Sequence, residues 1–149
     1  YEKEVTKVSR RYTDFLTVLI MAYIVQRFVD PKKQEPYTVE QLADQCRIPV
    51  KLTTMIVRQL LALNLIVEVK YTKQSRTGNY YPAVDPETLT VGSLIARLDS
   101  VGSENFKVDR RKYAREWELT LASRAALQEE STHVLLKHLP LGRENLRPI

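Results

Sequence analysis

The feature that most constrains the fold is the order of structural signals between residues 37 and 99. Thr38 and Gln41 have the spacing of a capping box, in which two side chains satisfy backbone N–H groups at the start of a helix. Pro49 interrupts this short helix, because the residue before a proline avoids helical dihedral angles and proline suits a first helical turn. A second helix is predicted over residues 50–63, and two strands and a third helix follow. This order predicts a winged helix-turn-helix.

The second predicted helix has a wide apolar side and a narrow exposed one. Two neighbouring apolar stripes run along it, formed by Leu52, Ile56, Leu60 and Leu63 and by Val50, Val57 and Leu61. At about 100° per residue, its outward side carries Lys51, Thr54, Met55, Arg58, Gln59 and Ala62. If the helix entered the major groove of DNA, this side would offer only two cations and two small or amide polar groups, few compared with the bidentate arginine and asparagine contacts that read bases.

A strand, a polar tip and a returning strand follow the second helix. Residues 65–71 are rich in branched and aromatic side chains, which predicts a half-buried strand. Residues 72–79 supply the polar tip, and residues 80–84 the returning strand, which Pro82 confines to a sheet edge. Thr90 is the predicted cap of a further amphipathic helix.

Helices are predicted on both sides of this unit. Residues 15–25 are apolar except for Thr17, but a spanning helix needs roughly 20 such residues, so an amphipathic helix over residues 4–28 is favoured. In the C-terminal third, a four-residue apolar step that includes Trp117 predicts one helix with Trp117 as a packing anchor, and residues 134–139 predict a second. These helices can cover the first helix of the same chain or pair with another copy.

The expected fold class is therefore mostly α, an α+β winged helix-turn-helix in which a helical bundle carries a two-stranded β wing and extra N- and C-terminal helices. Three parts are expected: a long helix and linker over residues 1–36, the winged unit over 37–102, and a helical extension with a loose tail over 103–149. The single cysteine, Cys46, excludes a disulfide framework and is interpreted as a small buried side chain. Its isolation fits a reducing compartment.

Several segments resemble the C-terminal soluble tail of the YihY/BrkB (ribonuclease BN-like) integral membrane proteins. The segments that carry the resemblance are residues 1–11, 37–43, 47–50 and 81–91, with a weaker likeness over 133–140. The resemblance implies a non-catalytic interaction or regulatory domain on the cytoplasmic face of the inner membrane. The start at Tyr1 without an initiator methionine fits a piece of a longer protein. A weaker similarity, limited to the winged core, is to IscR-like transcription regulators, whose cluster-binding cysteines have no counterpart here.

Charge argues for a partner other than DNA. Phosphate neutralisation by Lys and Arg supplies much of nucleic-acid affinity, yet residues 37–102 contain seven basic and six acidic residues, a net charge of +1. The candidate contacts with nucleic acid or another partner are Arg47, Lys51, Thr54, Arg58, Lys73 and Arg76. The expected partners are accordingly the protein's own membrane domain or a second copy of the chain, and a DNA-binding transcription regulator is the alternative.

A basic stretch lies outside the winged unit, between residues 107 and 115. It is interpreted first as a solvated loop and helix start, second as a contact with anionic lipid headgroups, and third as a contact with nucleic acid. The candidate membrane-surface contacts are Lys107, Arg110, Arg111, Lys112 and Arg115.

No catalytic, metal or cofactor site is predicted. The only histidines, His133 and His138, are five positions apart and would point in different directions on a helix, so they cannot share a metal. Glu129 and Glu130 would also diverge, and no Ser or Cys nucleophile has an assignable base. The ribonuclease in the family's older name therefore predicts no activity for this chain.

Overall fold

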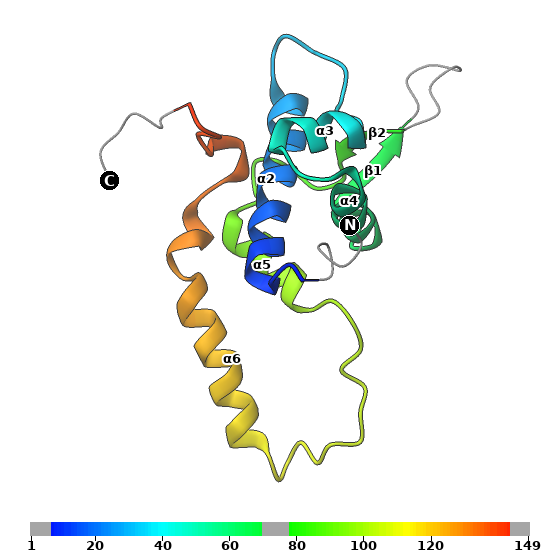
Figure 1. Ribbon diagram of the computed structural model, residues 1–149. Coiled ribbons are helices and arrows are strands. Elements are labelled where there is room, and N and C mark those ends of the chain that lie inside the picture. The colour runs from blue at the N-terminus through cyan, green and yellow to red at the C-terminus, as the bar shows by residue number, and fades with distance from the viewer. Residues whose placement is uncertain (1–6, 70–77, 144–149) are drawn as a thin grey trace.

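The computed structural model describes residues 7–69 and 78–143, apart from the side chains of Leu127 and Gln128. Its architecture is the predicted mostly helical α+β winged helix with a two-stranded antiparallel sheet (Figure 1). The elements are α2 (Arg10–Val29), α3 (Val39–Cys46), α4 (Val50–Ala62), β1 (Ile66–Val69), β2 (Asn79–Pro82), α5 (Val91–Asp99), α6 (Ala114–Gln128) and the 3₁₀ helices η1 (Glu130–His133) and η2 (Leu136–His138).

Helix α2 is the centre of the core. Its buried residues face α3, α4, α5, β2 and η2, and Ile20, Met21 and Val25 are completely inaccessible to solvent. By length and composition alone α2 could cross a membrane, but here its apolar residues form the middle of the winged-helix core. The predicted start at residue 4 is too early, because Ser9 accepts a hydrogen bond from the backbone N–H of Tyr12 at 3.1 Å and so caps the helix.

The sheet forms the base of the wing. Strands β1 and β2 pair antiparallel from Ile66 opposite Pro82 to Val69 opposite Asn79. Pro82 has no N–H to donate, but the Ala83 N–H donates to the Leu65 carbonyl at 2.8 Å and continues the same register by one hydrogen bond. Most of the predicted tip, residues 72–77, lies outside the described residues.

The predicted helix over residues 134–139 is reduced to the 3₁₀ turn η2 at Leu136–His138. Val134 and Leu135 are extended, and Leu135 forms an isolated β-bridge with Thr90. The Val91 N–H donates to the Val134 carbonyl at 2.8 Å, and the Leu136 N–H donates to the Leu89 carbonyl at 3.1 Å. These partners, far away in sequence, satisfy the backbone without a helix.

The C-terminal segment completes the core that α2 begins. Leu136 is completely buried, and η2 packs on α2. The Gln26 amide holds the segment in place, because its Nε2 donates to the Leu136 and Leu139 carbonyls at 3.1 and 2.7 Å while its Oε1 accepts from Arg143 at 2.6 Å. Part of the predicted loose tail is thus anchored.

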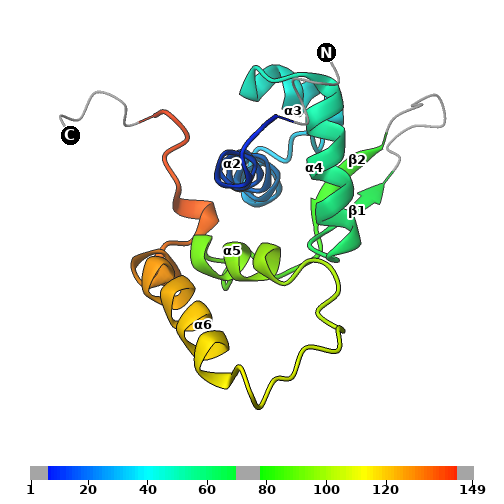
Figure 2. The same ribbon diagram turned by 60° about the horizontal axis from the view of Figure 1, so that its bottom comes forward.

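Helix α6 extends away from this core (Figures 1 and 2). Of its described side chains only Arg124 is not exposed, and Arg124 donates to both carboxylate oxygens of Asp99 on α5 at 2.6 and 2.7 Å. Trp117 is 43% exposed in this chain, so it does not act as the packing anchor that was predicted. Helix α6 also leaves the outer face of α2 uncovered, where Tyr12 and Phe15 are exposed.

Gly92 tests the contact between α5 and the returning C-terminal segment. A Cβ atom at this position would lie 2.8–2.9 Å from the backbone N and Cα of Thr132. Helix propensity alone predicts that Gly92→Ala stabilises the protein by up to about 1 kcal/mol. We expect the opposite sign, a loss of about 1–3 kcal/mol in the free energy of unfolding from overpacking, measured by urea denaturation.

The matched control is Ala96→Gly on the exposed side of the same helix. It measures the intrinsic difference between alanine and glycine in α5, so that the contact with Thr132 can be separated from helix propensity. A Gly92→Ala variant more stable than the parent would contradict the close approach.

Candidate nucleic-acid interface

The turn between α3 and α4 is built around Arg47. The predicted capping box starts α3, with the Gln41 N–H donating to Thr38 Oγ1 at 3.2 Å and the Thr38 N–H donating to Gln41 Oε1 at 3.0 Å. Arg47 ends the helix in the left-handed conformation, with φ 56° and ψ 49°. The Ile48 N–H then donates to the Ala43 carbonyl at 3.0 Å and satisfies the end of α3. Arg47 is exposed and lies in the turn, three residues before the first residue of α4.

Helix α4 presents one side to the core and the other to solvent. Leu52, Thr53, Ile56, Val57 and Leu60 are buried. Lys51 and Arg58 are exposed, and Thr54 is half-buried. The structure thus brings Arg47, Lys51, Thr54 and Arg58 of the candidate contacts together, while Lys73 and Arg76 lie outside the described residues. Contact of these residues with a partner stays a prediction.

The predicted burial of Val50 is wrong. Val50 is 46% exposed, and Met55, one turn further along, is 51% exposed. Val50 is the first residue of α4, so no preceding turn of the helix lies beside its side chain. Periodicity could not reveal this, because it identifies a stripe without showing where the covering element ends.

Sequence reasoning also missed the contacts that fix the start of α3. The side chain of Asn79, at the base of the wing, is buried and donates to the Pro36 carbonyl at 2.6 Å. The Tyr80 N–H donates to the Tyr37 carbonyl at 3.1 Å. Arg27 stacks over the Tyr37 ring at 3.9 Å from its centroid. Strand β2 and helix α2 together hold the segment that leads into α3, so the described base of the wing is connected to the helix-turn-helix by hydrogen bonds.

Ion pairs with the C-terminal segment change the charge balance of the winged unit. Glu87 pairs with Lys137 at 2.6 Å, and Asp99 pairs with Arg124. Two of the six acids in residues 37–102 are therefore matched by cations from outside that range, and four remain to oppose its seven basic residues. Helix α4 itself contains no acidic residue. The sum over residues 37–102 therefore does not describe the charge on any one surface of the winged unit.

Two acids lie close together where α2 and α5 meet. Partial burial, followed by the nearby charge of Asp99, raises the pKa of Asp14, and the cations Arg10 and Arg124 oppose this rise. The hydrogen bonds from Arg124 to Asp99 correspondingly raise the pKa of the Arg124 guanidinium. This cluster connects α2, α5 and α6 and lies outside the helix-turn-helix.

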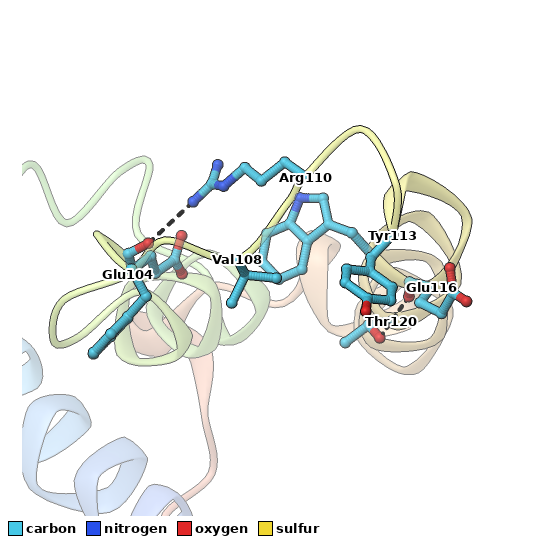
Figure 3. Close-up of a pocket in the computed structure, with 8 residues that line it drawn as sticks. Glu104, Val108, Arg110, Tyr113, Glu116 and Thr120 are labelled. Carbon is cyan, nitrogen blue, oxygen red and sulfur yellow. Dashed lines mark hydrogen bonds between the residues drawn. The ribbon is translucent and has the colours of Figure 1, made fainter.

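A concave region lies beside the N-terminal end of α6, away from the helix-turn-helix (Figure 3). Its volume is about 350 Å³, and Glu104, Val108, Arg110, Tyr113, Glu116 and Thr120 are among its lining residues. The guanidinium of Arg110 lies 5.9 Å from the Trp117 ring centroid, and the Lys112 ammonium lies 5.4 Å from that of Tyr113. The five basic candidates of this stretch are all exposed, as a solvated loop and helix start should be. Their contact with lipid headgroups stays a prediction.

The described residues that could act as metal ligands or nucleophiles do not gather at one site. Among the described residues, no group of three or more His, Cys, Asp or Glu side chains could hold a metal ion. His133 and His138 are both exposed and lie in separate 3₁₀ helices. Cys46 is half-buried, and this burial raises the pKa of its thiol, which disfavours the nucleophilic thiolate.

Solved structures with this fold include transcription regulators. CymR (YrzC), the global cysteine regulator of B. subtilis, has a TM-score of 0.57 and 18% identity over 88% of this chain and 93% of that chain. T. potens IscR has a TM-score of 0.60 and 21% identity over 96% and 92%. Staphylococcus aureus CymR has a TM-score of 0.58 and 18% identity over 85% and 93%. At these identities the likeness establishes the winged-helix fold. No protein-family model and no curated protein matches the chain.

These comparisons contradict the interpretation as a YihY/BrkB membrane-protein domain. The chain shares its fold along most of its length with regulators, and no family model supports the resemblance. Residues 37–43, 47–50 and 81–91 form the capping box, the interhelical turn and the exit from the wing. They are structural requirements of the winged helix and do not distinguish one family from another. The predicted location at a membrane face depended on this resemblance and stays untested.

Arg47 offers a direct test of the turn. For a residue other than glycine, the left-handed conformation is about 1–2 kcal/mol less favourable than the right-handed one, and glycine avoids this cost. We expect Arg47→Gly to raise the free energy of unfolding by about 0.5–1 kcal/mol, because glycine's larger unfolded-state entropy offsets part of the gain. Arg47→Val should lower it, since a β-branched residue tolerates positive φ poorly. Equal stability of the two variants would contradict the left-handed turn.

Proposed function

We propose that this protein is a DNA-binding winged-helix transcription regulator. The observation that carries the proposal is the outward side of α4, which presents Lys51 and Arg58 without any acidic residue in the helix. In a helix-turn-helix the second helix lies in the major groove and its N-terminal residues contact base edges. Arg47 lies three residues before the first residue of α4 and adds a third cation. The shared fold with CymR and IscR supports the same function.

The proposed function involves no chemical step. The exposed cations neutralise phosphates and release counterions, which supplies affinity, while side chains on the first turns of α4 face the base edges. The connection from Asn79 and Tyr80 to the segment before α3 would keep the wing and α4 in one fixed relation on the duplex. No metal or cofactor is needed for this binding.

A salt titration on duplex DNA tests the proposal. We expect the logarithm of the binding constant to fall linearly with the logarithm of salt concentration. Arg47→Gly, Lys51→Ala and Arg58→Ala should each weaken binding and reduce the slope by about 1 where the side chain contacts a phosphate. The measurement is fluorescence anisotropy with labelled duplexes at several salt concentrations.

Arg111→Ala is the control for loss of a surface cation, because Arg111 is exposed but lies in the loop before α6. It should leave the slope unchanged. A binding constant independent of salt, or equal effects of Arg111→Ala and Arg58→Ala, would count against α4 as the DNA-binding surface.

We also propose that the regulator is a homodimer formed through α6. Trp117 and Leu121 lie four positions apart on one side of α6 at 43% and 47% exposure, and Tyr113, the residue that precedes the helix, continues this side at 43%. Contiguous exposed apolar surface of this kind marks association sites. Cyclic dimers are the commonest homo-oligomers, and a two-fold axis would place two copies of α4 on successive major grooves.

The oligomeric state should depend on the side of α6 that carries Trp117 and Leu121. We expect sedimentation velocity to give a dimer for the parent and a monomer for Leu121→Glu, because a charge in an apolar interface is not solvated. Ser123→Glu introduces the same charge about 200° further around the helix and should leave the dimer intact. A monomeric parent chain at high micromolar concentration would rule out this interface.

A further inference from the structure

We infer that α4 recognises thymine through apolar contacts, with Met55 and Val50 packed against thymine methyl groups in the major groove. This inference rests on the proposed DNA-binding function and names the base that its reading helix selects. The 5-methyl group of thymine is the one apolar feature that a base pair presents in the major groove, so apolar side chains can distinguish it.

The position of the two side chains carries the inference. Val50 and Met55 are 46% and 51% exposed, and both lie within the first six residues of α4. This is the part of a recognition helix that reaches base edges. Single exposed apolar residues are common on protein surfaces. Here, however, the two flank Lys51 and Thr54 on the outward side of the helix that the fold presents to DNA.

The polar side chains on the same side of α4 cannot distinguish all four base pairs by hydrogen bonds alone. Thr54 Oγ1 donates its proton to the Val50 carbonyl at 2.9 Å, so it offers DNA only a lone pair and a methyl group. Lys51 and Arg58 are donors only, suited to guanine or phosphate. Bidentate recognition of adenine requires Asn or Gln, and the outward side of the first two turns has neither.

The chemistry of Met55 suits this role. Methionine is unbranched, and its polarisable thioether adapts to irregular apolar surfaces. Lys51 and Met55 are four residues apart and so are neighbours on the helix. A phosphate or guanine contact by Lys51 would therefore bring the Met55 side chain close to an adjacent base pair. Val50, at the very start of the helix, would lie towards the other flank.

The experiment replaces thymine by uracil within a bound duplex. Duplexes that bind the full chain are first selected from a random pool, and each thymine in the selected sequence is then exchanged for uracil, which removes only the methyl group. We expect one or two positions in each half-site at which the exchange weakens binding roughly fourfold, the value expected for one buried methyl group. Exchanges outside the protected segment serve as the internal control.

Variants of Met55 connect the effect to this side chain. Met55→Leu keeps an apolar side chain and should keep the sensitivity to uracil. Met55→Gln keeps the side-chain length and the helix propensity but should abolish the sensitivity to uracil at one position. A double-mutant cycle of this variant with the thymine-to-uracil exchange measures the contact between the two groups. Val29→Ala shortens a similarly exposed apolar residue at the C-terminal end of α2 and should leave the sensitivity to uracil unchanged.

The outcomes separate this inference from the proposed function. Binding that is salt-dependent but equally strong for thymine and uracil at every position overturns thymine recognition and leaves the proposed function standing. Uracil sensitivity that persists in Met55→Gln and in Val50→Ala also overturns it, because other residues then contact the methyl groups. Failure to select any duplex overturns both.

Discussion

The burial of α2 is the interaction on which the rest of the structure depends. Ile20, Met21 and Val25 are removed completely from solvent, and burial of apolar surface stabilises the fold by about 25 cal/mol per Å². Elements far apart in the sequence meet on this helix, since α4, β2 and η2 all pack on it and Leu136 of η2 is completely buried. Helix α4, which we propose contacts DNA, therefore packs on a helix that is fully buried only when the C-terminal segment covers it.

The charge of the winged unit shows why a sum over sequence can mislead about an interface. Glu87 and Asp99 count as acids of the unit, yet Lys137 and Arg124 neutralise them from more than 20 residues away. Binding depends on the potential at one surface, and charges on other surfaces contribute weakly beyond a Debye length of about 8 Å. The relevant quantity is the composition of α4, which has two cations and no acid.

Local signals predicted the winged unit well and the C-terminal part poorly. The capping boxes at Thr38 and Thr90 and the ends of α4 follow from neighbouring residues, so sequence was sufficient for them. The extended path through Val134 and Leu135 depends on hydrogen bonds to Leu89 and Val91, more than 40 residues distant, which no local pattern encodes. Four of the candidate contacts lie on one side, as their positions in the turn and in α4 predicted. The exposure of Val50 and the burial of Asn79 were missed, because tertiary packing sets both environments. The division of the chain at residues 36 and 102 stays a prediction.

The left-handed conformation of Arg47 connects stability with the proposed function. Glycine would satisfy this turn at lower conformational cost, and nothing in the hydrogen bonding of the turn requires a side chain, because the bonds are made by backbone groups of Arg47 and Ile48. Strain of this kind persists where the surrounding structure determines the conformation, and it gathers at functional sites. An arginine in the turn, three residues before the first residue of α4, adds a positive charge near a helix end that already favours anions through its dipole. A phosphate contact at this point would account for a residue that the turn alone would not select.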